Sequence, residues 1–93
     1  MFDWNDLRFL LAVADAGSTL AAARALGVNQ STVQRRLTEL EARLGHRLVV
    51  RLTSGYQLTD LGAAVLPQAR AVAEAIDSFE QAVRDQGRAL GGV

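Results

Sequence analysis

Residues 22–44 read AARALGVNQSTVQRRLTELEARL, and this stretch decides how the rest of the chain folds. Small side chains predict a helix that ends at Leu26, where Gly27 permits a tight turn. Asn29 can then cap a second helix over residues 30–44. A helix of small residues, a glycine turn and a capped second helix, in this order, predict a helix-turn-helix.

The second helix of this stretch has two different faces. Its apolar side chains recur at spacings of four, three and four, and at roughly 100° per residue they form one stripe: Val33, Leu37, Leu40 and Leu44. The polar side chains opposite are Ser31, Gln34, Arg35 and Thr38, which we call the reading face. Gln can pair with adenine, Arg with guanine, and Ser or Thr with either base. On an isolated helix these would be ordinary solvated residues, but the helix, turn and cap before them favour contact with base edges.

Length and composition exclude several classes of protein. A chain of 93 residues indicates one domain, and the absence of Cys excludes disulfides and thiolate metal sites. We expect the one His, His46, to lie at the surface, because a zinc site needs about four ligands. The sequence shows no nucleophile–base pair and no phosphate loop, so we expect no enzyme, no cofactor and no metal. The N-terminus does not resemble a signal peptide and no apolar run is long enough for a membrane, which favours a cytoplasmic, nucleoid-associated protein without a membrane partner.

The charge is distributed unevenly although the net charge is zero. Residues 24–51 hold six arginines against two glutamates, a local charge of +4. Residues 1–23 and residues 52–93 each carry −2. The positive charge therefore gathers on the helix-turn-helix and the segment after it, which suits contact with phosphates. All ten basic residues are Arg, a bias for which a GC-rich genome is a sufficient explanation.

Before the motif, the sequence predicts one further helix. Asp3 can cap it and Gly17 can end it, and we interpret Trp4 as packing material. The first helix of the motif then starts at a cap formed by Ser18 or Thr19. The side chains that we expect to face inward from it are Leu20, Ala23 and Leu26.

After the motif, residues 48–52 form a β-branched run, residues 53–55 suggest a turn, and residues 56–58 return. A two-stranded hairpin is marginal alone, so it must pack on the helices. The predicted fold class is therefore mainly α, a winged helix-turn-helix of three helices and a two-stranded wing, followed by a long linker helix.

The last helix carries an apolar pattern that suggests dimerisation. Thr59 can cap it, and apolar residues then alternate at spacings of four and three. We define the seam as Val65, Ala69, Val72, Ile76, Phe79 and Val83. Because about 60 residues make a marginal fold, we expect the seam to pack on a partner chain, the alternative being that it folds back on its own domain. The predicted boundaries are 1–58 for the winged domain, 59–88 for the linker helix and 89–93 for a frayed tail.

At this point the sequence resembles the DNA-binding domain of LysR-type transcriptional regulators. The matching positions are Gly17-Ser18, Ala22-Ala23, Leu26, Val28, Gln30, Val33, Arg35, Leu37, Leu40-Glu41, Leu44-Gly45, Arg47-Leu48, Arg51 and residues 58–62, LTDLG. The resemblance covers about residues 3–75. It implies a bacterial repressor or activator that dimerises through the linker helix. It also implies tetramers in full-length members, with a C-terminal domain that senses a small-molecule effector. We expect that domain to be absent from these residues.

The resemblance also implies where DNA binds. Together with the exposed polar positions, the candidate DNA-binding residues are Asn29, Gln30, Ser31, Thr32, Gln34, Arg35, Arg36, Thr38, Arg51 and Ser54. The chain departs from the family pattern at Ser31, where Pro is frequent, and at Gln34, where Ser is frequent. A longer amide at Gln34 can read a different base, so the operator sequence is not inherited with the family. The wing tip lacks the basic residue that many relatives carry.

Two functions remain open from the sequence. The first is sequence-specific binding of double-stranded DNA by a homodimer on an operator with two half-sites. The second is a protein-interaction module that heterodimerises with another regulator and sequesters it. The seam fits both functions, whereas the reading face fits only the first.

Overall fold

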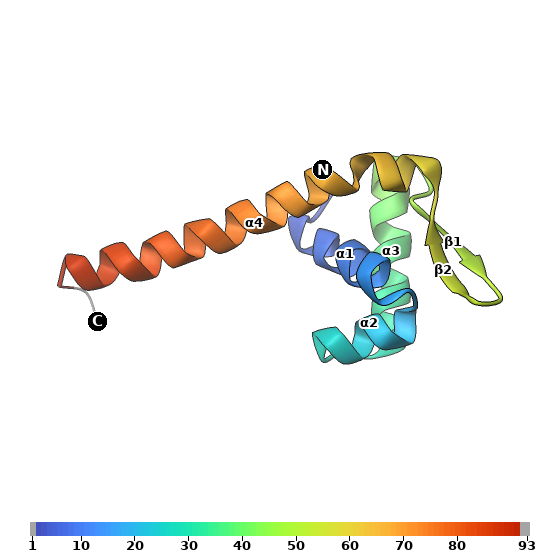
Figure 1. Ribbon diagram of the computed structural model, residues 1–93, viewed down its shortest axis with the longest axis horizontal. Coiled ribbons are helices and arrows are strands. Elements are labelled where there is room, and N and C mark those ends of the chain that lie inside the picture. Colours follow the sequence, from blue (N-terminus) through green and yellow to red (C-terminus); the bar gives the residue numbers. More distant parts are fainter. Residues whose placement is uncertain (1, 92–93) are drawn as a thin grey trace.

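The computed structural model describes residues 2–91. In chain order, the elements are η1 (Trp4–Asp6), α1 (Leu7–Ala16), α2 (Thr19–Leu26), α3 (Gln30–Leu44), β1 (Val49–Leu52), β2 (Gly55–Leu58) and α4 (Asp60–Ala89). In Figure 1, α1, α2 and α3 pack together, the two strands form a wing at one side, and α4 crosses the domain and extends away from it. The predicted winged helix-turn-helix with a long last helix is confirmed.

Local chemistry sets most helix ends as predicted. Ser18 caps α2, because its Oγ accepts a hydrogen bond from the Ala21 amide at 3.1 Å. Gly27 ends α2 with a φ of 69°, a conformation that suits glycine. Asn29 occupies the cap position of α3, but its side chain makes no capping hydrogen bond to the described helix. Instead the Asn29 carbonyl accepts from the Thr32 amide at 3.1 Å, so its backbone alone begins the helix.

The core is formed by α1, α2 and α3, together with residues at the start of the wing and one residue of α4. The buried apolar side chains of the described residues are Leu7, Phe9, Leu10, Val13, Ala22, Ala23, Val33, Leu37, Leu40, Leu48, Val49 and Ala69. Three positions of the predicted α3 stripe are therefore in the core, whereas Leu44 at the helix end is exposed. Leu20 is also exposed, so the prediction that it faces inward is wrong, since it lies on the outer side of the first turn of α2. Trp4 is 54% exposed because η1 holds it outside the core, which corrects its interpretation as packing material.

The wing is a tighter hairpin than the sequence predicts. Leu52 pairs with Gly55, so Thr53 and Ser54 alone form the turn and Gly55 belongs to β2. The Tyr56 amide donates to the Gly17 carbonyl at 3.0 Å. This hydrogen bond ties the second strand of the wing to the end of α1.

A joint formed by residues of α3, the entry to β1 and the start of α4 fixes the wing and the last helix. The Glu41 carboxylate accepts hydrogen bonds from the amides of Leu48 at 2.6 Å and Val49 at 3.2 Å. The Thr59 amide donates to the Leu48 carbonyl at 2.9 Å. Gly62 lies so close to that same carbonyl that a Cβ atom has no room. The three elements therefore meet at the backbone of residue 48.

The first half of α4 packs on its own domain. Ala69 is 5% exposed and belongs to the core, and Val65 and Val72 pack against it. Arg70 donates to the Asp15 carboxylate at 2.6 Å, which holds α4 against α1. The prediction of one continuous seam facing a partner is thus wrong for Ala69, because its own domain covers it. α4 itself runs to Ala89, and the last two residues of the predicted tail lie outside the described residues.

Candidate nucleic-acid interface

The first turns of α3 present the reading face to solvent. Ser31, Arg35 and Thr38 are exposed and Gln34 is half-buried. The Thr38 hydroxyl donates to the Gln34 carbonyl at 2.9 Å, one turn back along the helix. The buried stripe on the other side holds this face outward. The helix therefore offers an amide, a guanidinium and hydroxyls side by side, groups that can bond base edges and phosphates.

Gln30 and Thr32 stand at the start of α3, beside α2. The Gln30 amide nitrogen donates to the Thr19 hydroxyl at 2.9 Å, and Thr19 is buried. This hydrogen bond joins the first residues of the two helices of the motif. Gln30 is exposed, so its remaining amide groups stay accessible together with those of Asn29.

Arg36 differs from its neighbour Arg35. Its guanidinium lies 3.3 Å from the Asp6 carboxylate, 3.9 Å from that of Asp3, and 5.9 Å from the centre of the Phe9 ring. The structure thus turns this candidate DNA-binding residue toward η1 and α1. Sequence reasoning missed Asp6 as its partner, because the residues are 30 positions apart and no local pattern connects them.

Burial changes the acidity of Asp6. Removal from water raises the pKa of this carboxyl above its usual 3.8, and the nearby positive charge of Arg36 opposes that rise. At the surface the opposite occurs at Asp15, whose pKa is lowered by the hydrogen bond from Arg70. Both carboxylates therefore belong to contacts that position helices.

The wing supplies the other two candidates. Arg51 is exposed on β1, opposite Tyr56 on β2, and Ser54 is exposed in the turn. Arg47, just before β1, lies 3.4 Å from the Glu41 carboxylate through its Nε. The wing therefore carries one arginine on its strand, while another takes part in its attachment to α3.

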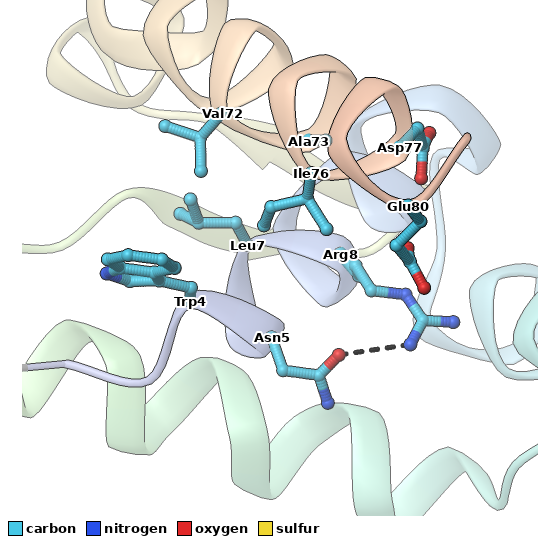
Figure 2. A pocket seen from close by; sticks show the side chains of 9 residues that line it. All are labelled: Trp4, Asn5, Leu7, Arg8, Val72, Ala73, Ile76, Asp77 and Glu80. Atoms are coloured by element: carbon cyan, nitrogen blue, oxygen red, sulfur yellow. Dashed lines mark hydrogen bonds between the residues drawn. The ribbon is translucent and has the colours of Figure 1, made fainter. Parts of the chain in front are cut away.

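The second half of α4 leaves large apolar side chains in solvent. Phe79 is 70% exposed and Val83 is 55% exposed. Ile76 is half-buried and lines a hollow of about 610 Å³ between α4 and the start of the chain. Figure 2 shows Trp4, Leu7 and Val72 toward one end of this hollow, and Arg8 and Glu80 toward the other. Within the seam, Ala69 is thus buried, Val72 and Ile76 are half-buried, and Phe79 and Val83 are exposed.

No helix within residues 2–91 combines the length and apolar character needed to cross a membrane. In the same residues, His, Asp and Glu side chains form no group of three that could hold a metal ion.

Comparison with known proteins identifies the family. Residues 4–63 match the family described as "Bacterial regulatory helix-turn-helix protein, lysR family". The chain is 46% identical over 86 residues to a "Probable hydrogen peroxide-inducible genes activator" of Mycobacterium xenopi, an alignment that covers 92% of this chain and 46% of the relative. It is 40% identical over 85 residues to the "Small neutral protease regulatory protein" of Streptomyces coelicolor, covering 91% of this chain and 27% of the relative.

Solved structures agree with this match. The crystal structure of a complex between the CbnR DBD and DNA superposes with a TM-score of 0.84 at 35% identity, covering 92% of this chain and 99% of that one. Oxidized OxyR of Corynebacterium glutamicum superposes with a TM-score of 0.86 at 28% identity, covering 89% of this chain and 27% of that one.

The aligned segment spans less than half of the Mycobacterium xenopi relative and about a quarter of the Streptomyces coelicolor protein. The family match, the alignments with relatives and the superposed structures all include the helix-turn-helix, the wing and the start of α4. The chain belongs to the LysR family of bacterial regulatory helix-turn-helix proteins and corresponds to the DNA-binding domain of that family.

Proposed function

We propose that this chain binds double-stranded DNA sequence-specifically as a homodimer and regulates transcription. Residues 1–58 read the DNA and residues 59–88 link the two copies. The observation that carries the proposal is the exposed reading face on α3, within a segment of charge +4, in a fold whose neighbours include a DNA complex.

The proposed binding mode follows from the shape of the domain. An α-helix fits the major groove of B-DNA, and Gln30, Ser31 and Arg35 are exposed at the start of α3. Gln34 lies in the second turn of α3, where its amide suits the two bonding groups of an adenine. Arg35, beside it, suits a phosphate or a guanine. Arg51 and Ser54 on the wing lie outside α3 and supply contacts to the flanking backbone.

A second copy is required because one helix contacts only a few base pairs, too few to select one site in a genome. Two copies related by a two-fold axis read half-sites about 34 Å or a multiple apart. The second half of α4 suits this contact, since Phe79 and Val83 are large, apolar and exposed in the single chain. We assign Phe79, Val83 and the half-buried Ile76 to the dimer, and Val65, Ala69 and Val72 mainly to the core of their own domain.

Selection of bound sequences from a random DNA pool, followed by titration of the selected duplex, tests the proposal. We expect one recovered motif with two related half-sites and binding that weakens steeply as salt rises. Recovery of unrelated sequences with equal affinity contradicts sequence-specific binding. It then favours the protein-interaction module, for which the same exposed Phe79 and Val83 would be the surface.

The dimer contact has a separate test. A carboxylate placed at Phe79 must lose its water to enter an interface, so Phe79→Glu is expected to sediment as a monomer with its helicity retained. Ser78→Glu is the matched control, because it adds the same charge one position away on an exposed residue outside the seam. A Phe79→Glu protein that sediments as a dimer at micromolar concentration contradicts the assignment of α4.

A further inference from the structure

One partly buried ion pair joins the middle of α3 to the start of the chain. Asp6 is 2% exposed at the junction of η1 and α1, and the Arg36 guanidinium reaches it from α3. The same guanidinium lies between the Asp3 carboxylate at 3.9 Å and the face of the Phe9 ring at 5.9 Å. Three side chains from the beginning of the chain therefore surround a side chain from the middle of α3.

This arrangement is a poor source of stability. The buried Asp6 carboxylate loses its hydration, and this cost offsets part of what its attraction to the half-buried Arg36 contributes. In addition, Arg36 Nε is buried and has no hydrogen-bond partner among the described residues, which adds a cost of its own. The pair can instead constrain the orientation of α3 relative to η1 and α1, because an ion pair and a hydrogen bond need a defined geometry and apolar packing tolerates small shifts.

The contacts of Arg36 depend on how α3 is rotated about its own axis. Arg35 and Arg36 are neighbours, so their side chains leave the helix about 100° apart. Arg35 is exposed beside Gln34, whereas Arg36 points back to η1 and α1. A rotation of α3 about its axis would move the reading face away from the bases and would also break the contacts of Arg36.

We infer that Arg36 is a positioning residue that, held by Asp6, Asp3 and Phe9, sets the rotation of α3 and does not itself contact DNA. The inference rests on the proposed DNA-binding function and removes Arg36 from the contact residues predicted from sequence. Arginine suits this role better than lysine. Its planar guanidinium can face two carboxylates and an aromatic ring together, whereas an ammonium is a compact point charge.

The test compares Arg36→Gln, Arg36→Lys and Asp6→Asn with Arg35→Gln in the full chain. Affinity is measured for the selected duplex and for an unrelated duplex over a series of salt concentrations. Arg35→Gln is the matched control, since loss of an exposed phosphate contact lowers the salt slope by about one unit on both duplexes. Because unfolding removes specific and non-specific binding alike, the ratio of the two affinities reports the geometry of the folded domain.

We expect Arg36→Gln to keep the wild-type salt slope and to lose specificity by about tenfold or more, because one misplaced base contact is worth on the order of 5- to 150-fold. Arg36→Lys keeps the positive charge and is still expected to lose specificity. Asp6→Asn removes a negative charge, which by charge alone would tighten DNA binding, yet it is expected to weaken specific binding. If Arg36→Gln does not fold, Arg36→Lys and Asp6→Asn decide.

Three results overturn the inference. They are a lower salt slope in Arg36→Gln that matches Arg35→Gln, full specificity in Arg36→Lys, or tighter specific binding by Asp6→Asn. Failure of the proposed function looks different, because the unchanged protein then recovers no motif at all. In that case there is no reading face to position, and both proposals are wrong.

Discussion

Gly62 and Gly87 lie on the same helix in opposite surroundings, so the same substitution should have opposite effects at the two positions. A Cβ atom on Gly62 would overlap the Leu48 carbonyl, whereas a Cβ atom on Gly87 meets no heavy atom within 4 Å among the described residues. Alanine is the better helix former by roughly 1 kcal/mol in a helix interior, and by less at Gly62 and Gly87, which lie close to the two ends of α4. The comparison therefore isolates the cost of the contact at the joint.

The contact with the Leu48 carbonyl decides whether Gly62→Ala stabilises or destabilises the protein. The overlapping atom is a backbone oxygen that accepts the hydrogen bond of the Thr59 amide at 2.9 Å, so it cannot move without weakening the start of α4. Overpacking costs about 1–3 kcal/mol where side chains can adjust, and a backbone neighbour puts this site at or above the upper end. After the gain in helix propensity, we expect Gly62→Ala to lower stability by about 2 kcal/mol.

Thermal unfolding followed by circular dichroism measures this difference. A loss of about 2 kcal/mol corresponds to a Tm lower by roughly 8–16 °C for a domain of this size. Gly87→Ala is expected to leave the Tm unchanged or to raise it slightly. The reasoning is refuted if Gly62→Ala melts at the wild-type temperature, because α4 would then not need its close approach to the entry of the wing.

Three further predictions concern the core and two carboxylates. Leu40→Ala should cost about 2–5 kcal/mol in urea unfolding and Leu44→Ala clearly less, since only Leu40 is fully buried; equal losses would contradict the core. Asp15 has a lowered pKa, so its contact with Arg70 stabilises the fold above pH 3.8 and loses this effect as pH falls through the lowered value. Asp15→Asn should therefore be less stable than wild type at neutral pH and equally stable in acid, and a deficit that persists in acid refutes the contact. Asp6 has a raised pKa, so its contribution to stability is present below pH 3.8 and declines as pH rises through the raised value. The stability of wild type relative to Asp6→Asn should therefore fall over that pH range, and an increase in relative stability would contradict the prediction.

Much of the fold could be predicted because the deciding signals are local. A hydroxyl before a helix and a glycine after it satisfy backbone groups within a few residues, which is why Ser18, Gly27 and Thr59 mark the helix ends correctly. The periodic stripe of α3 could be predicted for the same reason, since spacing alone puts Val33 and Leu40 on one side. Leu44 leaves the stripe because little of the domain covers the last turn of α3.

What the sequence could not give is the identity of the partner on each face. The apolar pattern on α4 predicts that Ala69 and Phe79 each pack against another surface. It does not tell whether that surface belongs to the same chain or to a partner. The structure puts Ala69 in its own core and leaves Phe79 exposed, so the two positions of the seam have different surroundings in the single chain. Likewise Arg35 and Arg36 look equivalent in sequence, and only the folded position of Asp6 separates them.

Selection of DNA sequences by the unchanged protein and by Gln34→Ala, in parallel, tests the central claim that the reading face of α3 recognises bases. We expect the unchanged protein to recover one motif with two half-sites, and Gln34→Ala to recover the same spacing with preference relaxed at one or two base pairs in each half-site. Titration should show a loss of about 1–3 kcal/mol on the wild-type motif. An identical motif and affinity for both proteins would contradict the claim, because the amide at the centre of the reading face would then touch no base.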